Sequence, residues 1–243
     1  IDISMFKFDF VIDNATRSIL IELKNEYDSE KAISLLKDLK LAKEIGNRYH
    51  ICHISTKETV WALRDARKTN SVVSGEACPH HLILTDDNIK DMNPNYKMNP
   101  PLRSKEDLNA LIEGINDGSV TVISTDHAPH ATEEKNKPID KAPFGIIGNQ
   151  HAFSLMYTYI VKKGLIPLEK VLTCMSINPA KIIGIEHDLE VGLKANFIVF
   201  DLEEEYVITK ESIKSKSINT PFIDTKCFGA LKYHVLDGEV TEI

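Results

Sequence analysis

The sequence of 243 residues lacks both a long apolar run and an excess of basic residues. No apolar stretch reaches the roughly 18 residues that a membrane-spanning helix needs, so we expect no membrane association. The formal net charge of −7 leaves no basic surface of the kind that binds nucleic acid. We therefore expect a small-molecule or protein partner.

Cysteine is scarce, and its spacing excludes further classes. The four cysteines contain no Cys-x-x-Cys pair of the kind found in structural zinc or dithiol redox sites; they are Cys52, Cys78, Cys174 and Cys227. No signal peptide is visible, and we expect a reduced, cytoplasmic compartment. The 11 glycines and 10 prolines exclude a low-complexity chain, and a hydrophobic content of 42% suffices for a sizeable core.

Helical and strand patterns alternate from about residue 29, which predicts an α/β fold with a mostly parallel sheet wrapped by helices. Ser55 with Glu58, and Ser104 with Asp107, are typical of helix starts. The strands expected between the helices are 49–53, 72–76 and 120–123. Polar residues gather after these strands, which fits part of a (β/α)8 barrel. A doubly wound sheet is the alternative.

The pattern changes towards the carboxyl end. Two helical stretches, 150–163 and 167–176, precede a short helix that we expect Asn178 to cap, with Pro179 at its first position. From residue 189, short strand signals separated by turns predict a small β appendage; they are 195–201, 206–208 and 232–240. The alternation in 6–10 suggests a strand to which we assign no role.

The most informative stretch is Ile123-Ser124-Thr125-Asp126-His127-Ala128-Pro129-His130, where an apolar run ends in an acid flanked by two histidines. A carboxylate at the end of a buried strand would face a cleft. Asp126 could there bind a metal, act as a general base, or do both. The alternative is that Asp126 caps a turn, with both histidines on a solvated loop.

His53 ends an earlier apolar strand in the same way. With a period of two, Ile51 and His53 point one way while His50 and Cys52 point the other, so His53 rather than His50 is predicted to face the barrel mouth. A buried histidine bonded to the backbone is the alternative. The histidines of Pro79-His80-His81 are better suited to supporting a ligand or the fold than to binding metal directly.

Two loops have the composition of ligand-binding segments. Lys97-Met98-Asn99-Pro100-Pro101-Leu102-Arg103 is stiffened by two prolines and can hold an amide and a guanidinium towards an anionic ligand. Its alternative role is a turn into the helix at Ser104. In Ala142-Pro143-Phe144-Gly145, a glycine beside a rigid turn lets the backbone approach a ligand closely.

Taken together and in this order, these segments resemble the dihydroorotases of the amidohydrolase superfamily. The matching segments are 50–56, 79–82, 97–103, 124–130, 142–145, 178–180 and 219–222. Several ordered matches are far more specific than any single one.

The resemblance implies the carboxyl-terminal portion of a (β/α)8 barrel in residues 1–188 and a small β-sandwich appendage in residues 189–243. It also implies a two-zinc site. The residues that match the family's pattern are His53 and Asp126 as metal ligands, Asp126 as the proton-transfer residue, Asn99 and His130 as substrate-binding residues, and the backbone at Ala142 and Gly145 as the pocket wall. Arg103 lies in a matching motif, and support of the neighbouring helix is an equal alternative for it.

The implied reaction is the reversible interconversion of N-carbamoyl-L-aspartate and L-dihydroorotate. The family's His-x-His pair, its arginine, its bridging lysine or aspartate and its strand-five histidine are absent from residues 1–28. The sequence therefore resembles the carboxyl-terminal part of an enzyme, and we expect the chain alone to be inactive. Alternatives are an inactive scaffold for a partner such as aspartate transcarbamoylase, or a related allantoinase or dihydropyrimidinase. A homodimer is a further expectation.

Overall fold

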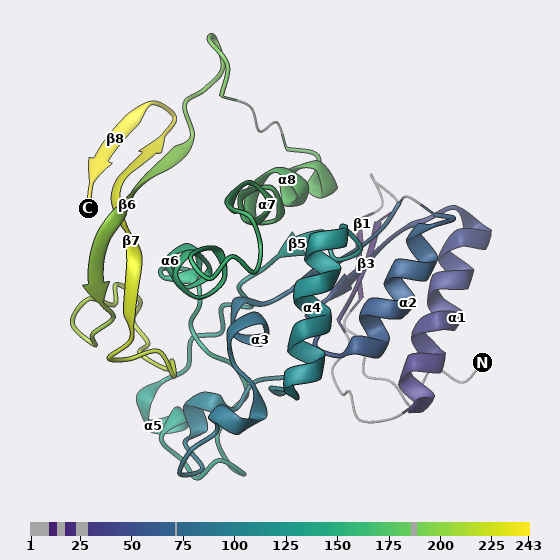
Figure 1. The fold of residues 1–243 in the computed structure, drawn as a ribbon, viewed down its shortest axis with the longest axis horizontal. Coiled ribbons are helices and arrows are strands. Elements are labelled where there is room, and N and C mark those ends of the chain that lie inside the picture. Colours follow the sequence, from purple (N-terminus) through teal and green to yellow (C-terminus); the bar gives the residue numbers. More distant parts are fainter. Residues whose placement is uncertain (1–9, 14–17, 23–28, 71, 186–188) are drawn as a thin grey trace.

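The computed structural model describes residues 10–13, 18–22, 29–70, 72–185 and 189–243 (Figure 1). Most of the segment 6–10, for which the alternation suggests a strand, lies outside these residues. No described helix has the length and apolar character that crossing a membrane requires.

The larger sheet contains five strands in the order β1-β2-β3-β4-β5. The strands are β1 (Phe10–Asp13), β2 (Ser18–Glu22), β3 (Arg48–Cys52), β4 (Val73–Ala77) and β5 (Val122–Ile123). β1 is antiparallel to β2, whereas β2, β3, β4 and β5 run parallel. The predicted mostly parallel α/β sheet is therefore present, and its parallel strands all end at one edge.

Three long helices lie side by side over one face of this sheet (Figure 1). They are α1 (Ser29–Ile45), α2 (Lys57–Arg67) and α4 (Lys105–Asp117). Ile51 of β3 and Val73 of β4 are buried in the same apolar cluster as Leu63 of α2. Close packing is enforced at Gly75, where an added Cβ atom would lie 2.6 Å from the Leu63 Cδ2 atom. The core thus sits between the sheet and these helices.

The starts of two helices test the predicted caps. Ser104 caps α4 as predicted, because its hydroxyl accepts from the Asp107 amide at 3.3 Å. The prediction that Ser55 caps α2 is wrong. Thr56 is the cap and accepts from the Thr59 amide, whereas Ser55 is buried and its hydroxyl accepts from the Arg103 Nε atom at 3.2 Å.

The segments after β4 and β5 are short helices joined by long loops. They are α3 (Pro79–Ile83), the 3-10 turns Asp86–Asn88 and Pro94–Tyr96, α5 (Thr132–Lys135), α6 (Ala152–Met156), α7 (Leu168–Leu172) and α8 (Asn178–Ile183). α6 and α7 continue into the π-helical turns Tyr157–Val161 and Thr173–Ile177. Asn178 is therefore not a cap, because the helix already runs through Ile177; its side chain instead donates to the Thr121 carbonyl at 2.8 Å.

The carboxyl-terminal strands form a separate antiparallel sheet of β6 (Phe197–Val207), β7 (Lys226–Leu236) and β8 (Glu239–Glu242). The two strands expected at 195–201 and 206–208 are one strand, with a register shift between Asp201 and Glu205. The sheet packs on α6, where the Phe153 and Phe200 ring centroids lie 4.2 Å apart. The described part of the appendage is this single sheet, not a two-sheet sandwich.

Candidate metal and active site

The carboxyl ends of three parallel strands bring the candidate residues together. His53 follows β3, Cys78 follows β4 and Asp126 lies just beyond β5. The His53 Nε2 atom is 3.7 Å from the Asp126 Oδ1 atom, and both side chains are largely buried. The two residues that the sequence singles out as metal ligands are therefore neighbours, although they are 73 residues apart in the chain.

The route by which His53 reaches this site differs from the predicted one. Strand alternation was expected to place His53 on the same side as Ile51, but Ile51 packs in the core beneath the helices. His50 and Glu76 lie on the opposite face. His53 has a φ of 53°, and this left-handed backbone turns its ring back towards Glu76. The expectation that alternation separates His53 from His50 is wrong, because both rings contact Glu76.

Glu76 links the two histidines. Its Oε2 atom lies 3.1 Å from the His50 Nε2 atom, and its Oε1 atom lies 2.9 Å from the His53 Nδ1 atom. Burial opposes ionisation of this carboxyl, but hydrogen bonds from His50 and His53 outweigh it and hold the pKa of Glu76 at about 2. Glu76 is therefore an anionic acceptor at neutral pH.

This acceptor sets the tautomer of His53. Because a carboxylate can only accept, the His53 Nδ1 atom carries the proton and the Nε2 lone pair is directed towards Asp126. A metal-binding histidine commonly donates its other ring N–H to a carboxylate in this way. His50 completes the chain, since its Nδ1 atom can accept from the Ser74 hydroxyl at 2.7 Å.

The donor set fits a metal ion. His53, Cys78 and Asp126 each offer one ligand atom, and these atoms lie within 4.8 Å of one another. Nitrogen, thiolate sulfur and carboxylate oxygen are the donors that zinc accepts in proteins. The sequence did not indicate Cys78 or Glu76. The available signal for Glu76 was a carboxylate inside an otherwise apolar or small-residue strand, Val73-Ser74-Gly75-Glu76-Ala77.

Asp126 has the environment of a proton acceptor. Burial raises its pKa above the usual value, the negative charge of Glu76 raises it further, and His53 opposes both effects. Its φ of 47° also lies in the left-handed region, so the backbone departs from the extended strand conformation at this residue. Asp126 can therefore both face a metal and bind a proton more readily than an exposed aspartate.

The neighbouring histidines have supporting contacts. The His81 Nε2 atom donates to the Pro100 carbonyl at 2.9 Å, beside Asn99. Burial lowers the pKa of His81 to about 4 and lowers the pKa of His80 well below its usual value, so both rings are neutral. His127 accepts from the Gly148 amide at 3.0 Å. His81 and His127 thus use a ring nitrogen to hold loops in place.

Two loops meet beside the candidate metal ligands. The Ala128 amide donates to the Ile146 carbonyl at 2.8 Å, and the His130 Nε2 atom donates to the Phe144 carbonyl at 2.7 Å. Gly145 has a φ of 113°, and an added Cβ atom would lie 2.4 Å from the Ala128 Cβ atom. The close approach of these loops therefore requires glycine at this position.

The remaining predicted site residues lie on segments that join these loops. The Gly145 amide donates to the Lys97 carbonyl at 2.9 Å, which places the segment containing Asn99 beside the glycine. Ala142 is buried, and its amide donates to the Pro138 carbonyl at 2.9 Å. The segments bearing Asn99, His130 and Gly145 thus adjoin, whereas the Ala142 amide is engaged within its own turn.

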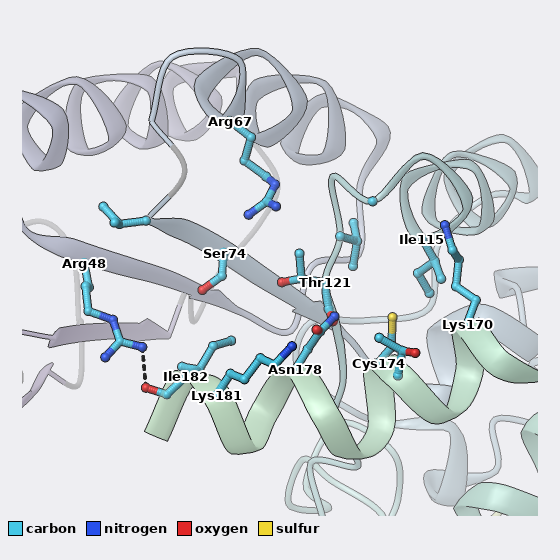
Figure 2. Close-up of a pocket in the computed structure, with 14 residues that line it drawn as sticks. Arg48, Arg67, Ser74, Ile115, Thr121, Lys170, Cys174, Asn178, Lys181 and Ile182 are labelled. Carbon is cyan, nitrogen blue, oxygen red and sulfur yellow. Dashed lines mark hydrogen bonds between the residues drawn. The ribbon is translucent and has the colours of Figure 1, made fainter. Parts of the chain in front are cut away.

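A cavity of about 500 Å³ lies at the other end of the strands and is lined by none of these residues. Figure 2 shows Arg67 and Lys181 around Ser74 and Thr121 in this cavity. Arg48 and Arg67 each donate to a backbone carbonyl there. The candidate metal ligands therefore lie at the carboxyl ends of the strands, and this basic cavity lies at their amino ends.

A sequence profile described as Amidohydrolase family matches residues 11–241. The chain belongs to the amidohydrolase family. Proteins named dihydroorotase are similar to it: that of Bacillus caldolyticus is 48% identical over 82% of this chain and 47% of its own length. That of Ligilactobacillus salivarius is 43% identical over 96% of this chain and 54% of its own. The chain spans about half the length of the curated relatives it matches.

Solved hydantoinase structures share the fold. L-hydantoinase (dihydropyrimidinase) from Arthrobacter aurescens superposes with a TM-score of 0.81 at 28% identity, covering 87% of this chain and 48% of that protein. D-hydantoinase (dihydropyrimidinase) from Thermus sp. superposes with a TM-score of 0.80 at 22% identity, covering 88% and 49%. The sequence identity to the dihydroorotases is markedly higher than to these hydantoinases.

Proposed function

We propose that this chain supplies one side of the active site of a dihydroorotase, a cytoplasmic enzyme that reversibly cyclises N-carbamoyl-L-aspartate to L-dihydroorotate. The observation that carries the proposal is the pairing of His53 and Asp126, 3.7 Å apart at the strand ends, with Glu76 holding His53 in a metal-binding tautomer. The 43–48% identity to proteins named dihydroorotase supports this substrate over hydantoins.

The proposed architecture follows from the parallel sheet. Residues 1–188 would form part of a (β/α)8 barrel, whose active sites lie at the carboxyl ends of the strands. Residues 189–243 would form part of a β-sandwich that a second sheet completes. Several large apolar side chains of β6, including Ile198 at 52% exposure, are available to such a sheet.

We propose that His53 and Asp126 hold zinc, with two ions in the complete site. Zinc sites use three or four protein ligands, so these two residues need further ligands, and Cys78 is placed to supply one of them. When bound, zinc would polarise the ring amide carbonyl and lower the pKa of a water molecule.

The residues of this chain would then move one proton and hold the substrate. In the hydrolytic direction, Asp126 would accept the proton of the attacking water and pass it to the amide nitrogen, which leaves only when protonated. Cyclisation runs the same transfer backwards. Asn99 and His130 would hold the substrate carboxylate and ring, and the backbone near Ala142 and Gly145 would form the pocket wall.

Asp126→Asn tests the proposal in an enzyme that contains residues 1–243 together with the remaining metal ligands. We expect dihydroorotate hydrolysis to fall by about 10²–10⁴-fold, the usual contribution of a general base, and zinc content to fall as well. Asp65→Asn, on the exposed face of α2, is the matched control and should change neither. Full turnover by Asp126→Asn would exclude Asp126 as the base.

Alternative substrates separate the related functions. Turnover of hydantoin, dihydrouracil or allantoin without turnover of dihydroorotate would reject the proposed substrate. A protein that binds no zinc and turns over none of these would instead be the inactive scaffold. Light scattering, alone and with aspartate transcarbamoylase, tests the predicted homodimer and that association.

A further inference from the structure

Lys135 is a charged side chain buried at the end of α5, and it is only 2% exposed. Its Nζ atom donates to the carbonyls of Lys97 at 3.0 Å, Pro143 at 2.9 Å and Gly145 at 2.7 Å. An ammonium group has three N–H donors, so these carbonyls use all of them. The three hydrogen bonds of this lysine thus connect two loops.

No described carboxylate lies within ion-pair distance of Lys135. Burial and, to a smaller extent, the nearby charge of Lys97 lower the pKa of this lysine to about 8. A buried cation without an ionic partner is unfavourable unless its hydrogen bonds are all made. The three carbonyls therefore are the reason that a lysine can occupy this position, and no apolar residue could replace its contacts.

The two loops that Lys135 joins carry the proposed substrate-binding residues. The Lys97 carbonyl lies two residues before Asn99, and it also accepts from the Gly145 amide at 2.9 Å. On the other loop, the Phe144 carbonyl between Pro143 and Gly145 accepts from His130 at 2.7 Å. Three converging carbonyl oxygens repel one another in the absence of a cation.

We infer that Lys135 is a positioning residue whose ammonium group locks the Asn99 loop to the Gly145 loop and so fixes the ring of His130. The consequence for substrate binding rests on the proposed function; the locking of the two loops does not. Lys135 touches neither metal ligands nor substrate, so its removal should disturb substrate binding and leave zinc binding intact.

Hydrogen exchange in the 243-residue chain tests the locking directly. In Lys135→Met, which keeps the length of the side chain and removes its donors, we expect the Gly145 amide to exchange about tenfold faster or more. The NMR signals of the His130 ring should shift as well. Lys137→Met, an exposed lysine two residues later, is the matched control and should change neither signal.

The exchange of amides in α4 reports whether the variant folds. If α4 remains protected and the Gly145 amide of Lys135→Met exchanges as in the parent chain, the inference is overturned. If Lys135→Met does not fold, Lys135→Arg replaces it: a planar guanidinium keeps the charge but cannot direct three N–H groups at one converging set of carbonyls. Unchanged Gly145 exchange in folded Lys135→Arg would then overturn the inference.

Kinetics in an enzyme with the full ligand set separate positioning from general destabilisation. Lys135→Met should raise the KM for dihydroorotate about tenfold or more, with a smaller change in kcat and unchanged zinc content. Lys135→Arg should lie between the parent and Lys135→Met. An unchanged KM would reject the role in substrate binding. A parent enzyme that does not hydrolyse dihydroorotate would reject the proposed function. The hydrogen-exchange experiment would still test whether Lys135 holds the two loops together.

Discussion

At the scale of single residues, the site depends on one carboxylate, Glu76, that contacts two histidines. Glu76 accepts from His50 and His53 at 3.1 Å and 2.9 Å, and its pKa of about 2 keeps it anionic. An anionic acceptor leaves the His53 Nε2 atom unprotonated and ready for a metal. Glu76 therefore orients a candidate metal ligand that lies 23 residues before it in the chain.

Replacing Glu76 with glutamine should weaken zinc binding by about 10–100-fold. A neutral amide removes the charge, and its NH₂ group cannot accept from a histidine. Calorimetric titration of the 243-residue chain with zinc measures the effect. Glu113→Gln, on the exposed face of α4, should bind zinc like the parent chain. Equal affinities for the parent and Glu76→Gln would mean that the carboxylate does not orient His53.

At the scale of elements, the position of α2 on the sheet depends on a glycine in β4. A Cβ atom on Gly75 would lie 2.6 Å from the Leu63 Cδ2 atom and 2.7 Å from the Ile54 Cδ1 atom. Both distances are shorter than carbon atoms allow, so the helix or the strand would have to move. Because Glu76 is the next residue, this packing also determines where the carboxylate points.

Gly75→Ala should lower the free energy of unfolding by about 1–3 kcal/mol, the usual effect of overpacking a core. Urea denaturation of the 243-residue chain measures it. Combining it with Leu63→Val should relieve the clash, so that the double variant loses less stability than the sum of the two single variants. Additive losses would show that the two side chains do not compete for the same space.

At the scale of the whole molecule, buried neutral histidines couple folding to pH. Burial lowers the pKa of His151 to about 4, and its Nδ1 atom lies 3.1 Å from the Tyr206 hydroxyl of the carboxyl-terminal sheet. His80 and His81 are likewise held neutral by burial. Each of these rings would take up a proton near pH 6.5 in the unfolded chain.

The metal-free chain should therefore lose stability as the pH falls from about 6.5 to about 4. In this window the unfolded chain binds more protons than the folded chain, which favours unfolding. His151 alone should contribute a loss of about 2 kcal/mol at pH 5 relative to neutral pH. Urea denaturation at pH 7 and pH 5 measures the loss, and His151→Gln should reduce it. A variant with the parent's full pH dependence would show that His151 does not titrate as described.

Local patterns were sufficient wherever a feature depends on residues close in the chain. The cap of α4 could be predicted because Ser104 and the Asp107 amide are three residues apart. The position of Asp126 beyond a buried strand could also be predicted, because the apolar residues of that strand come shortly before it in the chain. The cap of α2 could not, because the buried Ser55 side chain is held by Arg103, 48 residues away, and the cap shifts to Thr56.

The order and spacing of the motifs, from His53 to Asp126, already pointed to the amidohydrolase family and to these two residues as candidate metal ligands. The tertiary structure alone decided which groups prepare those ligands. Glu76 contacts His53, which lies 23 residues earlier in the chain, and Lys135 contacts the Lys97 carbonyl, 38 residues earlier, so neither contact has a local signature. Strand alternation could not supply this information, because the left-handed backbone at His53 reverses the direction of its side chain at the point where the site forms.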